Sequence, residues 1–211
     1  MADFSKKLTM PSAQEAIPDR SQVISVSPQH VVTGNRIIAP FPENMQQALF
    51  GMGCFWGAER CFWQMPGIFS TAVGYAGGFT ANATYEDVCS GMSGHNEVVL
   101  VIYDPKVVSY QQLLIIFWQA HNPTQGMRQG NDRGSQYRSG IYCYNSEQYQ
   151  LAEKTKIQYQ KVLTEAGYGQ ITTEIIDVPE FYYAEDYHQQ YLAKNPRGYC
   201  GLGGVGVLFA D

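Results

Sequence analysis

The pattern of hydrophobic and polar positions changes near residue 46. Residues 1–45 contain prolines scattered among Ser, Gln and Asn, and they show no sustained period of 2 or 3.6. We therefore expect an irregular N-terminal arm packed on a single domain that covers residues 46–211. The end of this domain, residues 196–211, is rich in glycine and is expected to form a tail.

After residue 46 the apolar positions predict strands and helices in alternation. Short apolar runs predict strands over 48–52, 68–75, 97–103, 137–142 and 171–177. Apolar residues at helical spacing predict helices over 55–65, from the capping box at Ser109 onward, and from Asn145 to about Ala166. A glycine-rich loop is expected over 77–94. The order strand, helix, two strands, helix, strand predicts an α+β fold. We expect a two-layer α/β sandwich with a mixed sheet and a ferredoxin-like (split βαβ) core, with the irregular arm and tail added.

Composition and charge exclude several classes of partner. Charged residues make up 16% of the chain and the formal net charge is -5. Nucleic-acid binding needs a basic face, and no run of the sequence supplies one. The longest apolar block, Leu113–Trp118, is far shorter than the ~18 residues of a membrane span. The first twenty residues also lack the apolar segment of a secretory signal. We expect a cytoplasmic monomer with no membrane partner, in a compartment where thiols stay reduced.

The chain has five cysteines, and no two of them are spaced as C-x2–4-C. Ordinary zinc-site signatures are therefore missing, and no bound metal or cofactor is expected.

Cys54 is the cysteine with the most distinctive surroundings. It lies between Gly53 and Gly57 where a predicted strand turns into a helix. A helix N-terminus favours an anion and lowers the pKa of a thiol, so Cys54 is a candidate nucleophile. The alternative is a small buried hydrophobe, the usual role of intracellular cysteine. Phe55 and Trp56 follow directly, and from the residues alone they could be core or the apolar wall of a pocket.

Four blocks of sequence carry a family resemblance: GCFWG at 53–57, GHNEVV at 94–99, QGNDRGSQYRS at 129–139 and FYYAEDYHQQYL at 181–192. Together they closely resemble peptide methionine sulfoxide reductase A, over about residues 46–207. The arm is similar to the N-terminal extension of bacterial members. The resemblance implies a protein-repair enzyme of the oxidative stress response, which reduces methionine S-sulfoxide in proteins, in peptides or free.

The resemblance also implies a role for particular residues. The Cys54 thiolate would attack the sulfoxide sulfur, and Phe55 with Trp56 would hold the methyl group. Glu97 matches the acid that protonates the oxygen; it opens an apolar strand, and partial burial keeps a carboxyl protonated. Three further positions match the substrate-binding residues of the family: Tyr85, Asp132 and Tyr137.

Cys200 is the position implied to resolve the sulfenic acid left on Cys54. It lies in the glycine-rich tail, where the backbone has freedom to swing toward Cys54. Thioredoxin or another dithiol would then reduce the Cys54–Cys200 disulfide. Many members carry a further cysteine beyond this point, whereas this sequence has Leu208 in that region, so a single-step relay is expected. The remaining cysteines are expected to be structural, with Cys89 left open as a substitute resolving thiol: Cys61, Cys89 and Cys143.

Two functions of other classes stay open on the residues alone. The first is a cysteine hydrolase or acyltransferase that pairs Cys54 with His95 or His188 as base. It would turn over without added reductant. The second is a non-catalytic module that binds ligands through exposed aromatic side chains, and it would not need Cys54.

Overall fold

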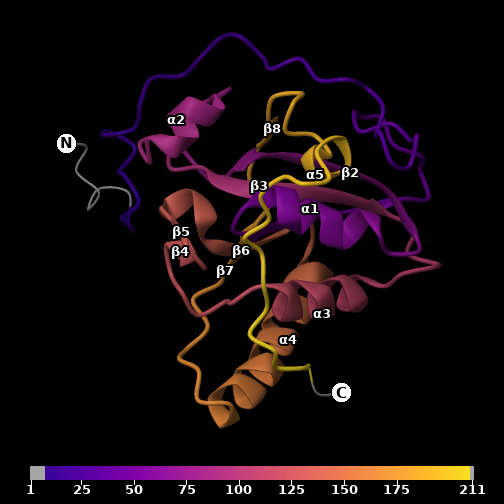
Figure 1. Ribbon diagram of the computed structural model, residues 1–211, viewed down its shortest axis with the longest axis vertical. Helices are drawn as coiled ribbons and strands as arrows, with labels where there is room; N and C mark the ends of the chain where they lie inside the picture. Colours follow the sequence, from indigo (N-terminus) through magenta and orange to yellow (C-terminus); the bar gives the residue numbers. More distant parts are fainter. Residues whose placement is uncertain (1–7, 210–211) are drawn as a thin grey trace.

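The structure, a computed structural model, describes residues 8–209 and is built on a six-stranded sheet (Figure 1). Its strands are β1 (Gln46–Met52), β2 (Ile68–Ala76), β3 (Asn96–Tyr103), β6 (Ser139–Cys143), β7 (Glu174–Asp177) and β8 (Phe181–Tyr183). The strand order is β7-β6-β1-β3-β2-β8. The central pairs β6–β1, β1–β3 and β3–β2 are antiparallel, whereas β7 pairs with β6 in parallel. This confirms the α+β fold with a ferredoxin-like core and a mixed sheet.

The helices follow the chain order that the sequence predicts, with two short additions. They are α1 (Phe55–Trp63), α2 (Tyr85–Cys89), α3 (Tyr110–Ala120), α4 (Ser146–Glu165) and α5 (Tyr191–Lys194). The capping box at the start of α3 is present, because the Ser109 side chain accepts from the Gln112 N–H. Asn145 caps α4 in the same way. Between α3 and β6 lie a small hairpin, β4 (Arg128–Gln129) and β5 (Asp132–Arg133), and a 3-10 turn at Ser135–Tyr137.

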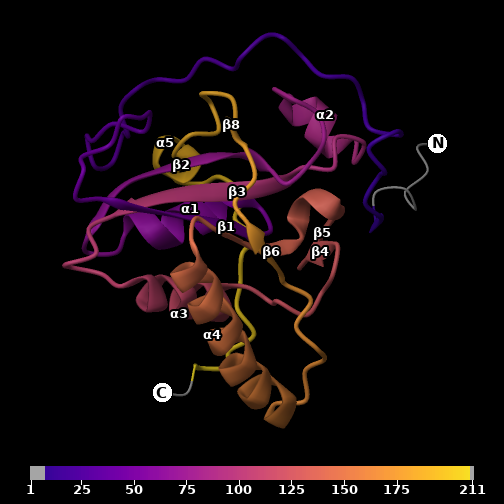
Figure 2. The same ribbon diagram turned by 180° about the vertical axis from the view of Figure 1, so that it is seen from behind.

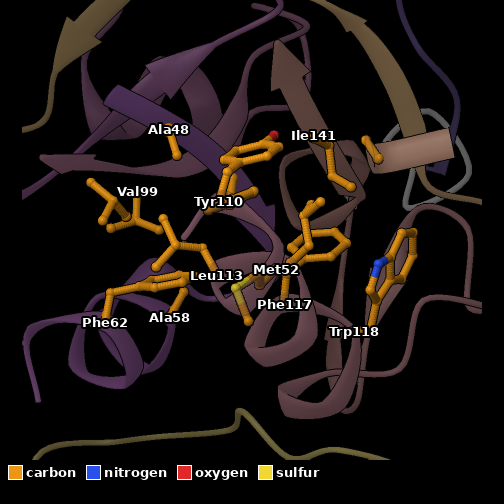
Figure 3. Close-up of a cluster of buried hydrophobic side chains, with 14 of the residues drawn as sticks. Ala48, Met52, Ala58, Phe62, Val99, Tyr110, Leu113, Phe117, Trp118 and Ile141 are labelled. Carbon is orange, nitrogen blue, oxygen red and sulfur yellow. The ribbon is translucent and has the colours of Figure 1, made fainter. Parts of the chain in front are cut away.

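The main core lies between the sheet and helices α1, α3 and α4. Side chains from one face of β1, β3 and β6 meet those of α1 and α3 (Figure 3). At its centre Phe50 stacks on Phe62 with ring centroids 5.3 Å apart, and Phe117 lies 5.4 Å from the same ring. Alternation along β3 sends Val99 to this face and Val98 to the other. Glu97 has the same parity as Val99, so the strand directs it toward the helices.

The other face of the sheet is covered partly by the N-terminal arm. Ile37 of the arm is buried against strand residues such as Leu49 and Leu100. His30 Nε2 lies 2.8 Å from Thr71 Oγ1 of β2. Much of the arm runs along the end of the molecule opposite α4 (Figures 1 and 2). The arm is therefore irregular, as the sequence predicts, but it packs buried side chains against the face of the sheet opposite the main core.

Several boundaries and short elements differ from the sequence prediction. The strand expected over 137–142 begins only at Ser139, because the preceding residues form the 3-10 turn. The strand expected over 171–177 begins at Glu174. The expected loop over 77–94 contains α2, whose five residues are too few to show a helical period. The elements β8 and α5 are shorter still and were not predicted.

The C-terminal tail crosses the helices after α5 (Figure 1). The Tyr168 hydroxyl donates to the Val205 carbonyl at 3.2 Å, and the Tyr159 hydroxyl donates to the Val207 carbonyl at 2.9 Å. These bonds fix the tail to α4 and to the segment that follows α4. Within residues 8–209, no helix is long and apolar enough to cross a membrane.

Candidate active site

The turn from β1 into α1 places Cys54 at the N-cap of the helix. Gly53 makes this turn with φ +87°, a conformation that other residues rarely adopt. A Cβ at this position would also lie 2.5 Å from the Gln129 side chain, so the close approach requires glycine. The Cys54 side chain that results is 7% exposed. The predicted location of Cys54 at the start of a helix is therefore present, but the thiol is more deeply buried than the sequence suggests.

Burial reverses the expected effect of the helix N-terminus on Cys54. Its pKa is raised, chiefly because burial disfavours the thiolate and then because the Glu97 carboxylate lies nearby. The backbone N–H groups of Trp56 and Gly57 lower the pKa, but they contribute less. The expectation of a lowered pKa for Cys54 is thus wrong. Cys54 is a protonated thiol at neutral pH.

Glu97 lies beside this thiol and is also buried, at 2% exposure. It stands opposite Tyr75 in the register of β2 and β3, and its Oε2 accepts a hydrogen bond from the Phe55 N–H at 3.1 Å. Burial raises the pKa of Glu97 to about 8, and the Phe55 bond opposes this shift. Glu97 therefore holds a proton at neutral pH, as a general acid must.

Seven residues that the sequence analysis assigned to the pocket lie around one cavity of about 160 Å³. They are Cys54, Phe55, Trp56, Tyr85, Glu97, Asp132 and Tyr137. They come from the start of α1, α2, β3, β5 and the 3-10 turn, so the cavity is assembled from segments far apart in the chain. An eighth lining residue, Tyr199, was missed, because an aromatic residue in a glycine-rich tail gives no sign of where it folds back.

The polar groups of the cavity present hydrogen-bond donors and a carboxylate. Burial raises the pKa of Tyr85 and of Tyr137, so both hydroxyls stay protonated and can donate. Burial also raises the pKa of Asp132. The Tyr199 hydroxyl donates to Asp132 Oδ1 over 3.4 Å, which links the tail to the rim of the cavity. Phe55 and Trp56 provide the apolar side.

Residues that do not line the cavity contact the lining residues from behind and hold them in place. The Trp56 indole N–H donates to His188 Nδ1 at 3.0 Å, and its ring stacks on Tyr191 with centroids 3.9 Å apart. Glu185 accepts the Tyr75 hydroxyl and the Tyr85 backbone N–H, each at 2.8 Å. No such role was predicted for the segment after β8. The block FYYAEDYHQQYL carried the signal, since it packs several polar and aromatic residues into one short stretch.

Neither histidine considered as a base has an unprotonated ring nitrogen that is available to Cys54. His188 Nδ1 accepts from Trp56, so its other nitrogen carries the hydrogen, and burial lowers the pKa of His188 to about 4. His95 Nδ1 accepts from the Gly78 N–H, and its Nε2 lies 2.7 Å from the Thr80 carbonyl, to which it donates. The geometry therefore does not support the cysteine–histidine pair of a hydrolase.

Cys200 lies outside the cavity, against the first turns of α1. Its Sγ accepts a hydrogen bond from Arg60 Nη2 at 3.1 Å. A Cβ on Gly57 would lie 3.0 Å from this sulfur, so the missing side chain of Gly57 makes room for it. Cys200 thus packs one helical turn beyond Cys54. None of the five cysteines forms a disulfide; Cys143 is buried, whereas Cys61 and Cys89 are half-buried.

Comparisons with known proteins point to a single family. The family model for peptide methionine sulfoxide reductase matches residues 46–204. A peptide methionine sulfoxide reductase MsrA of Nostoc is 64% identical over 97% of this chain and 92% of its own length. The solved methionine sulfoxide reductase A of Corynebacterium diphtheriae is 42% identical, covers 91% of this chain and 93% of its own, and superposes with a TM-score of 0.85. Mxr1 of Saccharomyces cerevisiae, solved in complex with Trx2, is 25% identical, covers 75% of this chain and 93% of its own, and has a TM-score of 0.50.

Proposed function

The chain belongs to the peptide methionine sulfoxide reductase family, and on that premise we propose the route by which it works. It is an oxidoreductase that reduces methionine sulfoxide. In the proposed route, Cys54 attacks the sulfoxide sulfur, Glu97 protonates the oxygen, and Cys200 resolves the oxidised cysteine. The S epimer is the expected substrate, in proteins, in peptides or free.

The observation that carries this route is the shared cavity of Cys54 and Glu97. A sulfoxide has an electrophilic sulfur, a basic oxygen and an apolar methyl group. The cavity offers a sulfur nucleophile, a protonated carboxyl and an aromatic wall within about 160 Å³. Tyr85 and Tyr137 would donate hydrogen bonds to the oxygen as negative charge develops on it. Each part of the substrate thus has a matching group.

The first step moves one oxygen atom from substrate to enzyme. The Cys54 thiol gives up its proton and its sulfur attacks the sulfoxide sulfur, while the proton of Glu97 goes to the sulfoxide oxygen. Cleavage of the sulfur–oxygen bond releases methionine and leaves a sulfenic acid on Cys54. The methionine sulfur is reduced by two electrons and Cys54 is oxidised by two. Glu97 regains the proton that the thiol released, so no net proton is consumed.

The second step forms a disulfide at the expense of the sulfenic acid. The Cys200 sulfur attacks Cys54 Sγ and water leaves. Gly57 supports this step, since its lack of a side chain lets Cys200 pack close to the start of α1. Cys200 still has to move toward Cys54, and the glycines that flank it give the tail that freedom.

A dithiol protein must then reduce the disulfide to restart the cycle. The Trx2 complex of the yeast relative supports thioredoxin as this partner. No cofactor takes part in the proposed route. The division into an arm and a domain, a monomeric state and a cytoplasmic location stay predictions.

Methionine yield in single-thiol variants tests the route. Reduced protein is mixed with methionine sulfoxide without reductant, and methionine is measured by chromatography. Cys54→Ser should give none. Cys200→Ser should give one methionine per chain and then stop, with a sulfenic acid on Cys54 that dimedone labels. Continued thioredoxin-driven turnover in Cys200→Ser would contradict the role of Cys200, and any yield from Cys54→Ser would contradict that of Cys54.

A further inference from the structure

Cys54, Gly57 and Cys61 follow one another along a single face of α1. Cys54 is the N-cap, and Gly57 and Cys61 lie three and seven residues further on. Residues three or four apart on a helix are surface neighbours, about 5–6 Å apart at Cβ. The two cysteines of α1 therefore flank Gly57 on the same side of the helix.

The tail places the Cys200 sulfur over Gly57, midway along this line. A Cβ on Gly57 would lie 3.0 Å from Cys200 Sγ, and Arg60 Nη2 donates to the same sulfur at 3.1 Å. Arg60 lies three residues beyond Gly57 in the direction of Cys61, so the bond holds Cys200 toward the Cys61 end of the line. Side chains of a helix lean toward its N-terminus, which brings the Cys61 thiol back toward Gly57.

The electrostatics of Cys61 agree with this placement. The pKa of Cys61 is raised, first by burial and then by the proximity of Cys200, whereas Arg60 lowers it. The two thiols are thus close enough in the reduced protein for the charge of one to affect the pKa of the other.

We propose that Cys61 takes over the disulfide from Cys54. The proposal rests on the proposed function, because it starts from the Cys54–Cys200 disulfide. The Cys61 thiolate attacks Cys200 Sγ, a Cys61–Cys200 bond forms, the Cys54–Cys200 bond breaks, and Cys54 leaves as a thiolate. The proton lost by Cys61 is replaced on Cys54 from solvent. One disulfide is exchanged for another, so no further oxidant or reductant is needed.

Helix geometry decides which sulfur is attacked. Seven residues of α-helix separate Cys54 from Cys61 by about 10.5 Å along the axis. A disulfide needs Cα atoms within about 7 Å, so the two helix cysteines do not bond to each other. Cys200 is the mobile member, and Gly201 and Gly203 beside it allow the tail to shift by one helical turn.

The exchange has a countable consequence, because it returns Cys54 to its reduced state before any reductant arrives. A chain that resolves only once yields one methionine and stops as the Cys54–Cys200 disulfide. A chain that passes the disulfide on to Cys61 yields a second methionine. It then stops with a Cys61–Cys200 disulfide and a sulfenic acid on Cys54. Excess substrate drives this exchange, because the second reduction consumes the free Cys54.

The test counts methionine released by the full chain. Reduced, desalted protein is incubated without oxygen or reductant in excess N-acetylmethionine sulfoxide. The wild type should release two equivalents and Cys61→Ser one. Cys89→Ser, which changes another half-buried thiol, is the matched control and should release two. Peptide mapping without reduction should find Cys61–Cys200 in the exhausted wild type and Cys54–Cys200 in Cys61→Ser.

The outcomes separate this inference from the proposed function. One equivalent from the wild type, or two from Cys61→Ser, would overturn the exchange and leave the reductase route intact. A fall to one equivalent in Cys89→Ser alone would assign the exchange to Cys89 and likewise overturn it. No methionine from the wild type would instead contradict the proposed function. The rate of the first turnover shows whether Cys61→Ser is folded, and Cys61→Ala serves as the second variant.

Discussion

Glu97→Gln offers the sharpest test of the proton donor, because it changes the shape of a pH profile as well as a rate. The pKa of Glu97 is raised to about 8, so about nine-tenths of it is protonated at pH 7 and about one-tenth at pH 9. Burial raises the pKa of Cys54 as well. Attack needs the Cys54 thiolate and the Glu97 acid together, so the rate follows the product of the two fractions.

This product predicts a break in the profile. Below about pH 8 the second-order rate of the first turnover should rise tenfold per pH unit, as thiolate accumulates. Above it the loss of the Glu97 proton cancels that gain, and the curve levels off. In Glu97→Gln the second factor is absent, so the curve should keep rising past pH 8. At pH 7 the variant should be slower by about 10²–10⁴-fold, the usual value of a general acid.

The measurement is a rapid-quench assay of methionine formation between pH 6 and 10, with substrate well below saturation so that the free enzyme titrates. Glu59→Gln is the matched control, since Glu59 is another buried glutamate whose pKa is raised, to about 7, yet it bonds to Thr71 and Gln190 away from the cavity. It should keep the break near pH 8. A Glu97→Gln profile with the wild-type break and rate would remove Glu97 as the donor.

Three further changes test other parts of the structure. Gly57→Ala puts a Cβ 3.0 Å from the Cys200 sulfur, so the first turnover should persist while disulfide formation slows at least tenfold, measured by free-thiol counts; an unchanged rate would contradict the packing. The folded protein holds the Glu59 proton up to about pH 7 but the unfolded chain loses it near 4.5, so stability falls as pH rises through this window. In urea unfolding, Glu59→Gln should reduce the pH-dependent loss of unfolding free energy by up to about 1.4 kcal/mol per pH unit. An unchanged dependence of the unfolding free energy on pH would contradict a buried proton on Glu59. Finally, the rate of alkylation of Cys54 should rise about tenfold per pH unit up to pH 9 without levelling off, because thiolate keeps accumulating below a raised pKa; an inflection below pH 7 would show a lowered thiol pKa.

The ferredoxin-like core could be predicted because its elements are long and regularly patterned. The run of six apolar and aromatic residues in β3, over 98–103, and the capping box at Ser109 are local signals, and local physics decides them. Elements of three to five residues, such as α2 and β8, contain too few positions to show a period. Their existence depends on partners that are distant in the chain; β8 pairs with β2 about a hundred residues earlier.

The candidate site likewise has features that the local sequence predicts and contacts between distant segments that it does not. The glycines around Cys54 indicate a strand-to-helix turn by local conformation alone, and the structure has it. The contacts of Tyr199 with Asp132 and of His188 with Trp56 join residues 67 and 132 positions apart. No pattern within either segment encodes such a meeting. The resemblance to a family predicted the residues that folding brings together around the cavity, but not the residues behind them, such as His188, that hold them in place.

The one error of chemistry at the site shows which effect prevails there. The sequence indicates a helix N-terminus at Cys54, and the favourable N–H groups are indeed present. Their effect on a thiol extends only over the first turn, whereas the burial penalty on a charge grows with every segment that closes over the sulfur. Here α1, β3 and the 3-10 turn all contribute to that closure. The burial that keeps Cys54 protonated therefore also keeps Glu97 protonated, and in the proposed route this is the proton that the sulfoxide oxygen receives.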